Sequence, residues 1–191
     1  MYIGLFFGSF NPIHTGHLII GSSLLNQTAL QKIWFVVSPH NPLKEKESLL
    51  PQQDRLHLVR LAIEHNPKFA ASNIEFKLPQ PSYTIDTLTV IREKYPQHRF
   101  ALIMGSDNLH SIEKWKHYEL LLRDYEIYVY RRGTTVETRF AAYPNIHILQ
   151  VPLLDISSSM IRGLLRNQQS TRYLLPEPVR EYVEANHLYA R

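Results

Sequence analysis

Two histidines stand three residues apart in residues 8–17, GSFNPIHTGH, directly after an apolar run that is typical of a strand. A helical pattern begins near Thr15, so His14 and His17 are expected on one face of a helix N-terminus. Free backbone N–H groups and the dipole at such a terminus favour a phosphate, and two imidazole donors would strengthen its binding. Gly8 would let the backbone turn and approach a ligand closely. The pattern predicts a phosphate-binding loop.

Two plainer interpretations of the histidine pair stay open. They are ordinary surface histidines at a helix start, or part of a metal site. A structural zinc site normally needs four ligands, and neither a carboxylate nor a thiol stands close by in the sequence. We therefore expect no protein-held metal. The chain also has no Walker A motif and no complete GxGxxG, so two common phosphate-binding solutions are absent.

A second polar cluster, residues 155–162 with the sequence DISSSMIR, lies near the C-terminus. Its serines are typical helix-capping residues, and Arg162 falls within about the first turn of the expected helix. Taken alone, this pattern favours a plain capped helix with a surface arginine.

The surrounding elements alternate between strand and helix. Strands are expected at residues 2–7, 32–37, 73–76, 99–104, 126–130 and 146–151, and helices at 17–30, 53–65, 85–95, 108–122, 137–142, 159–167 and 178–187. This alternation predicts an α/β fold, a Rossmann-like doubly wound parallel sheet with helices on both faces. Ligands of such sheets bind beyond the carboxyl ends of the strands. We expect one domain over residues 1–191, with a C-terminal helical part from about 157 packed on it.

Composition narrows the class of protein. With 44% hydrophobic and 20% charged residues in a 191-residue chain, one packed core is expected and disorder is not. The absence of cysteine excludes disulfides and thiol catalysis. We expect a cytoplasmic protein, since no segment is typical of a signal peptide or a membrane span. The net charge of +4 is dispersed, which disfavours RNA binding and fits a small anionic ligand.

These motifs resemble a known superfamily. Residues 8–17 resemble the G-(T/S)-F-(D/N)-P-(I/V)-H-x-G-H signature of the nucleotidyltransferases, and residues 156–162 resemble their I-S-S-(T/S)-x-(I/L)-R motif. Ser159 departs from threonine there but keeps a hydroxyl. The resemblance implies adenylyl or cytidylyl transfer, and it leaves the acceptor open.

Later segments indicate the acceptor. Residues 82–88 (SYTIDTL), 103–108 (IMGSDN) with Trp115 downstream, 173–183 (YLLPEPVREYV) and 39–44 (PHNPLK) resemble the bacterial nicotinate-nucleotide adenylyltransferase family. Taken singly, most of these features have structural explanations: Thr84 and Asp86 could cap a helix, and Trp115 could be a core aromatic. Together with the two superfamily motifs, these segments cover essentially the whole chain in the family's order, and this joint pattern favours the family.

The resemblance implies that nicotinate mononucleotide attacks the α-phosphorus of ATP, giving nicotinate adenine dinucleotide and pyrophosphate, with Mg²⁺ carried by the ATP phosphates. It implies catalytic roles for His14, His17 and Arg162. The expected ATP contacts are these three with Gly8, Ser9, Phe10, Gly105, Asp107, Ser157 and Ser158. The expected acceptor contacts are Asn41, Lys44, Thr84, Trp115 and one of Arg131 and Arg132, with His40 as a weaker expectation.

Two alternatives to this reaction stay open at this point. Another adenylyltransferase of the superfamily would use nicotinamide mononucleotide or phosphopantetheine as its acceptor. A nucleotide-binding regulator would keep the fold without catalysis, although the intact His14, His17 and Arg162 disfavour it. A homodimer is the one protein partner we expect, and the sequence does not decide it.

Overall fold

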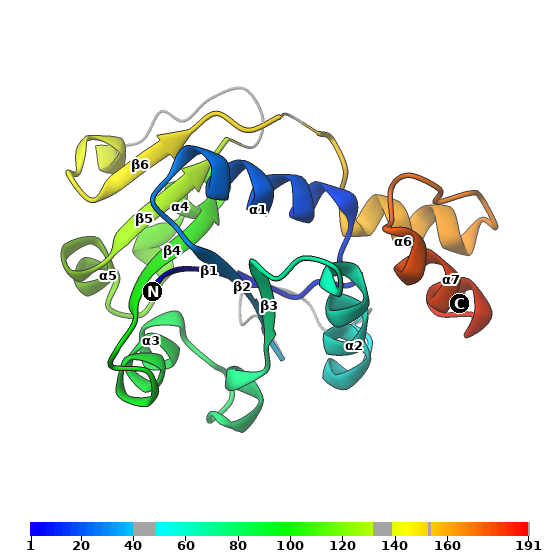
Figure 1. Ribbon diagram of the computed structural model, residues 1–191, viewed down its shortest axis with the longest axis horizontal. Helices are drawn as coiled ribbons and strands as arrows, with labels where there is room; N and C mark the ends of the chain where they lie inside the picture. The colour runs from blue at the N-terminus through cyan, green and yellow to red at the C-terminus, as the bar shows by residue number, and fades with distance from the viewer. Residues whose placement is uncertain (40–48, 132–138, 153, 191) are drawn as a thin grey trace.

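The computed structural model describes residues 1–39, 49–131, 139–152 and 154–190. Its centre is a six-stranded parallel sheet in the order β3-β2-β1-β4-β5-β6, shown in Figure 1. The strands are β1 (Tyr2–Gly8), β2 (Lys32–Val37), β3 (Phe69–Ser72), β4 (Arg99–Gly105), β5 (Glu126–Tyr130) and β6 (Ile146–Leu149). This strand order is that of doubly wound nucleotide-binding sheets, and it confirms the predicted fold class.

Helices cover both faces of the sheet. One buried cluster joins Phe6, Phe35 and Ile103 of the strands to α1 (Thr15–Gln27) and α2 (Gln52–Ile63). A second cluster joins the alternate strand residues, such as Leu5 and Leu102, to α3 (Thr84–Lys94), α4 (Ser106–His110) and α5 (Tyr118–Asp124). Alternate residues of a strand point to opposite faces, so strands apolar throughout pack helices on each side.

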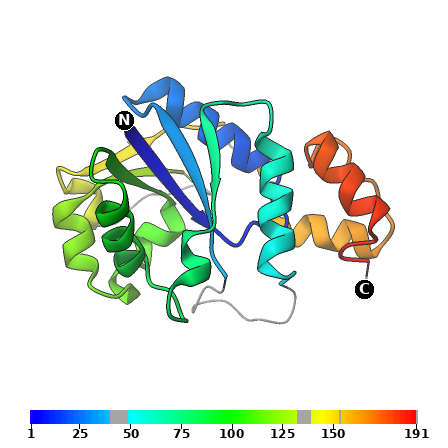
Figure 2. The same ribbon diagram turned by 60° about the horizontal axis from the view of Figure 1, so that its bottom comes forward.

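The C-terminal helices α6 (Ser158–Arg166) and α7 (Glu177–Ala185) lie beyond α1 and α2 (Figure 2). Ile161, Val179 and Val183 are almost fully buried in the same cluster as α1 and α2. The C-terminal part therefore shares a core with the sheet. None of the helices in the described ranges is long and apolar enough to cross a membrane.

Three predicted elements differ from the structure. Residues 73–76 form no strand: β3 lies just upstream, and η1 (Ile74–Lys77) is a 3₁₀ helix whose alternating Ile74 and Phe76 mimic a strand. The helix predicted at residues 108–122 is broken into α4, η2 (Ile112–Lys114) and α5. The backbone leaves the helical conformation at Trp115, which is extended, and at His117, which is left-handed with φ of 51°. The last helix predicted before β6 is seen only as the 3₁₀ turn η3 (Arg139–Ala142).

The strand register brings four strand ends to one edge. Gly8 pairs with Val37 of β2, Phe6 pairs with Ile103 of β4, and Gly105 pairs with Tyr130 of β5. The residues after these strands therefore share the carboxyl edge of the sheet. The chain order reverses between β1 and β4, which is where ligands of such sheets bind.

Candidate active site

The loop after β1 is shaped by Phe10. Phe10 has a left-handed backbone (φ 46°), is 2% exposed, and packs edge-on against Phe6 and Phe35. A Cβ atom on Gly8 would lie 2.8 Å from the Phe10 ring, so only glycine leaves room for this turn. Glycine at position 8 thus accommodates Phe10, and because its ring is buried, Phe10 can offer a ligand only its backbone.

The two histidines stack at the start of α1. Their ring centroids are 3.7 Å apart and the ring planes differ by 28°. His14 is the N-cap residue and is 4% exposed, while His17 is half-buried and contacts the Phe10 ring edge-on. The backbone N–H of His14 donates to Nδ1 of His17 at 3.2 Å. A neutral His17 therefore carries its proton on Nε2, which makes Nε2 a donor.

Helix α6 docks onto the same loop. Nη1 of Arg162 donates to the carbonyl oxygen of Asn11 at 2.8 Å, and the Ser158 hydroxyl donates to the carbonyl oxygen of Pro12 at 2.9 Å. Ser157 caps α6 by accepting from the N–H of Met160 at 3.2 Å. These bonds bring Arg162 to the histidine loop, as predicted. The predicted cap is present as well: the Ser157 hydroxyl caps α6, and the Ser158 hydroxyl docks α6 on the loop.

Arg162 is a half-buried cation. Its Nη2 donates to Ser159 at 3.2 Å, and its buried Nε has no hydrogen-bond partner among the described residues. Burial lowers the pKa of Arg162, and the nearby Tyr189 opposes this shift. Since a guanidinium stays protonated in proteins, Arg162 presents a positive charge that no carboxylate of the described chain neutralises. Such a group suits a phosphate.

Sequence reasoning missed the buried Arg55. Arg55 is 1% exposed and donates to four carbonyl oxygens: those of Ser9 (2.6 Å), Ser38 (2.7 Å), Pro39 (2.9 Å) and Leu50 (2.9 Å). Burial lowers the pKa of Arg55, yet the guanidinium stays charged. It ties the loop after β1 to the end of β2 and to the entry of α2. The available signal was an arginine on the helical stripe that also holds the buried Leu58 and Val59.

Asn11 and Tyr189 were missed as well. The side-chain oxygen of Asn11 accepts from the Tyr189 hydroxyl at 2.8 Å and from the N–H of Leu50 at 3.2 Å. Burial is the main cause that raises the pKa of Tyr189, so the phenol stays a donor. The C-terminal segment thereby supports the loop that carries the histidines. No motif marked Tyr189, since this contact joins opposite ends of the chain.

Asp107, one of the expected ATP contacts, lies just after the carboxyl end of β4. It is exposed in the first turn of α4. A Cβ atom on Gly105 would collide with Oδ1 of Asp107 and would lie 3.3 Å from the Tyr130 ring. The glycine therefore lets the Asp107 carboxylate fold back over the strand end. Because β4 adjoins β1, this carboxylate and the histidine loop share the switch point of the sheet.

The segments of Thr84 and Trp115 are joined by an ion pair. The Lys116 ammonium donates to both Asp86 oxygens, at 2.8 and 3.0 Å, and lies 5.1 Å from the centroid of the Tyr83 ring. Asp86 thus pairs with Lys116 and does not cap α3, whose N-cap residue is Tyr83. Thr84 is the first residue of α3. The two predicted acceptor contacts are therefore held on neighbouring segments.

Trp115 is half-buried against the cluster beneath α3 and α5. Its indole Nε1 is buried without a hydrogen-bond partner in the described ranges. Of the other predicted acceptor contacts, Arg131 is exposed directly after β5. His40, Asn41, Lys44 and Arg132 lie outside the described residues.

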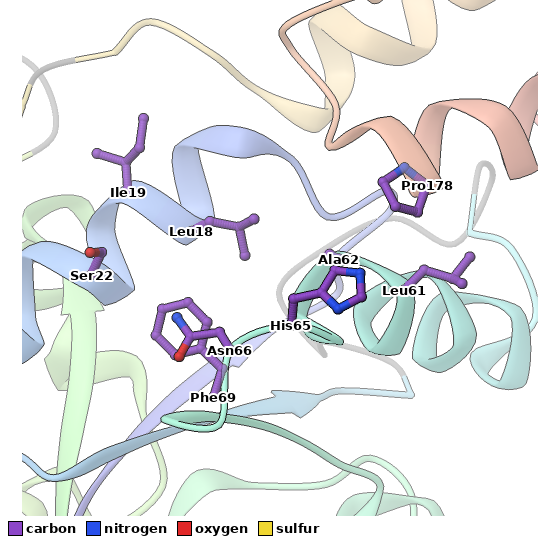
Figure 3. A pocket seen from close by; sticks show the side chains of 9 residues that line it. All are labelled: Leu18, Ile19, Ser22, Leu61, Ala62, His65, Asn66, Phe69 and Pro178. Carbon is purple, nitrogen blue, oxygen red and sulfur yellow. The ribbon is translucent and has the colours of Figure 1, made fainter.

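A separate groove of about 410 Å³ lies between α1, α2 and α7 (Figure 3). Its lining is mainly apolar, including Leu18, Leu61, Phe69 and Pro178, with His65 as its one titratable side chain. An apolar lining suits no triphosphate. The polar groups that converge at the carboxyl edge of β1 and β4 make that edge the candidate active site.

A nucleotidyltransferase is the class that this fold and loop define. The cytidylyltransferase-like family model matches residues 5–164, which hold the sheet, the histidine loop and most of α6. Solved structures agree on the fold. Plasmodium falciparum nicotinic acid mononucleotide adenylyltransferase complexed with NaAD superposes with a TM-score of 0.83 at 21% identity, covering 99% of this chain and 97% of that one. A putative nicotinate-nucleotide adenylyltransferase from Vibrio parahaemolyticus gives 0.72 at 18% identity, covering 98% and 94%.

Curated relatives give the narrower family. A probable nicotinate-nucleotide adenylyltransferase of Flavobacterium psychrophilum is 48% identical over the full length of both chains. Its counterpart in Cytophaga hutchinsonii is 50% identical over 100% of this chain and 99% of its own. The Bacillus licheniformis relative is 36% identical over 98% and 97%. The chain belongs to the nicotinate-nucleotide adenylyltransferase family.

Proposed function

We propose that this protein transfers the AMP moiety of ATP to nicotinate mononucleotide, giving nicotinate adenine dinucleotide and pyrophosphate. The observation that carries this proposal is the bond from Arg162 to the Asn11 carbonyl, because it brings the arginine of α6 to the loop of the stacked histidines. Three side chains suited to binding phosphate, from two distant parts of the chain, then lie at one edge of the sheet. The full-length relatives support nicotinate mononucleotide as the acceptor, and they do not favour another acceptor.

The chemistry requires positioning and charge neutralisation. The acceptor phosphate is already an anionic nucleophile, so no side chain has to deprotonate it. An oxygen of the acceptor phosphate forms a bond to the α-phosphorus of ATP. The bond between the α-phosphorus and the oxygen that bridges to the β-phosphate breaks, and pyrophosphate leaves with that oxygen. Nε2–H of His17 would donate to the phosphate oxygens as charge develops there. Arg162 would bind the β- and γ-phosphates through its planar set of donors.

ATP would enter as its magnesium complex. The donors at the phosphate loop are imidazole, guanidinium, hydroxyl and backbone N–H groups, which bind phosphate rather than a cation. In the described ranges no three histidine or carboxylate side chains gather closely enough to hold a metal ion. We therefore expect Mg²⁺ to be held by phosphate oxygens and water, where it would neutralise the charge of the leaving pyrophosphate.

Position-specific labelling of ATP tests this reaction. With the purified protein and nicotinate mononucleotide, label in the α-phosphate should appear in the dinucleotide and label in the γ-phosphate should appear in pyrophosphate. In the absence of acceptor, no α-label should become attached to the protein, because the transfer is direct. An adenylylated protein, or release of inorganic phosphate from the γ-position, would contradict the proposal.

A further inference from the structure

Glu75 is a buried carboxylate that the reaction described above does not use. It lies in η1, between β3 and α3, and is 2% exposed. The Thr87 hydroxyl donates to its Oε1 at 2.8 Å, and the Ser82 hydroxyl donates to its Oε2 at 3.2 Å. It forms no ion pair with any described cation. Burying a carboxylate without a countercharge is costly, so the hydroxyl donors are what make this position tolerable.

Glu75 accepts hydrogen bonds from residues on both sides of the start of α3. Ser82 lies two residues before Thr84, and Thr87 lies three residues after it. Thr87 also binds Tyr83, since its backbone N–H donates to the Tyr83 carbonyl oxygen at 3.1 Å. The backbone on either side of Thr84 is thus fixed to one carboxylate. The same helix start is tied to the segment of Trp115 by Lys116.

The Glu75 carboxylate also reaches the sheet. The Ser38 side chain, directly after β2, lies close enough to this carboxyl group to oppose the rise that burial causes in the pKa of Glu75. The carbonyl oxygen of Ser38 accepts from Arg55 at 2.7 Å, and Arg55 in turn binds the carbonyl oxygen of Ser9 in the phosphate loop. Ser38 therefore lies between the Arg55 contacts of the phosphate loop and the Glu75 carboxylate that binds the start of α3.

We propose that Glu75 is a positioning residue for the acceptor half of the active site. By holding the start of α3 to η1, which packs beside β2, it sets where Thr84 lies relative to the phosphate loop. Direct transfer depends on the distance between the acceptor contact Thr84 and the phosphate loop, because the nucleophile and the α-phosphorus must be held in line. The proposal rests on the proposed function, since it assigns Thr84 to the acceptor. Glu75 itself touches neither substrate.

Two variants test the proposal by comparing the change in KM for nicotinate mononucleotide with the change in KM for ATP. Glu75→Gln keeps the side-chain volume but cannot accept from both hydroxyls, and Thr87→Val removes one donor without changing shape. Each should raise KM for nicotinate mononucleotide, by about tenfold for Glu75→Gln, with KM for ATP within about twofold of the wild-type value. Glu93→Gln, exposed near the end of the same helix, is the matched control and should change neither constant.

A purely structural role would give a different pattern. Lower thermal stability with both Michaelis constants unchanged, or equal rises in both, would overturn the proposal. If Glu75→Gln does not fold, the same outcomes apply to Thr87→Val. Failure of the proposed function is a separate result, because it would appear as absence of nicotinate adenine dinucleotide with the wild-type protein.

Discussion

The backbone N–H of His14 donates to Nδ1 of His17, 3.2 Å away, across the first turn of α1. This single contact fixes which ring nitrogen of a neutral His17 carries the proton. It also uses the N-cap backbone of the helix to orient a side chain that the sequence predicts to bind phosphate. The edge-on contacts of His17 with Phe6 and Phe10 hold the ring from the other side.

His17→Ala should lower kcat by roughly a hundredfold or more, which is the scale of losing one preorganised donor to the transition state. The fold should survive, because His17 is only half-buried. Steady-state kinetics with saturating ATP and nicotinate mononucleotide measure the effect. His65→Ala, at an exposed position after α2, is the control and should behave as wild type. Wild-type turnover in His17→Ala would remove the histidine pair from the mechanism.

Arg162→Lys should raise KM for ATP by about tenfold although the charge is kept, because lysine cannot bind the Asn11 carbonyl and phosphate oxygens with one planar group. The exposed Arg166, one turn further along α6, offers a matched control. Arg166→Lys should leave KM for ATP unchanged. Equal effects of the two substitutions would mean that only the general positive charge of α6 matters.

Arg55→Leu should lower the free energy of unfolding by about 3 kcal/mol, since the fully buried guanidinium and its bonds to four carbonyl oxygens would be lost. Urea unfolding followed by circular dichroism measures this change. Arg60→Leu, exposed on the same helix, should shift it by no more than about 0.5 kcal/mol. An Arg55→Leu protein as stable as wild type would show that the three loop segments hold together without the guanidinium.

The sequence alone predicts the features of this fold that arise from residues close together in the chain. The alternation of strands and helices is local, so the doubly wound sheet follows from it, as do β1, β2 and β5 almost to the residue. The strand predicted at residues 73–76 was wrong because the apolar Ile74 and Phe76 alternate with polar residues as in a strand. The small side chains of Ala70 and Ala71 in the observed β3 give only a weak apolar pattern. The break at His117 is a backbone conformation that periodicity does not encode.

The residues of the candidate site also fall into two groups, those marked by local motifs and those that act through contacts distant in sequence. The histidine loop, Asp107 and Arg162 lie in or beside contiguous motifs, so they can be named without a structure. The residues that hold the loops, Arg55 and Tyr189, act through carbonyl and side-chain contacts with segments distant in sequence, and no local pattern identifies those partners. Glu75 resembled an ordinary polar strand residue, and only its burial marks it out.

Glu75 should also give the stability a distinct pH dependence. Burial raises the pKa of Glu75 above its ordinary value of 4.5, against the opposing effects of the Thr87, Ser38 and Ser82 side chains. The native state therefore binds more protons than the unfolded state as pH rises above 4.5, and Glu75 contributes stability that is lost through that window. The unfolding free energy of wild type minus that of Glu75→Gln should fall as pH rises.

Urea unfolding of both proteins from about pH 4 to about pH 8 measures this difference directly, since the other titrating groups cancel. The curve should level off once Glu75 is ionised in the native state. A difference that rises with pH would mean that the hydroxyl donors outweigh burial and lower the pKa.

The central claim is tested most directly by one parallel rate measurement with ATP and each of the two pyridine mononucleotides. If the account is right, the protein forms nicotinate adenine dinucleotide and pyrophosphate in equal amounts, with kcat/KM for nicotinate mononucleotide clearly above that for nicotinamide mononucleotide. Equal kcat/KM for the two acceptors would contradict the assigned acceptor. Release of no pyrophosphate with either acceptor would contradict adenylyl transfer itself.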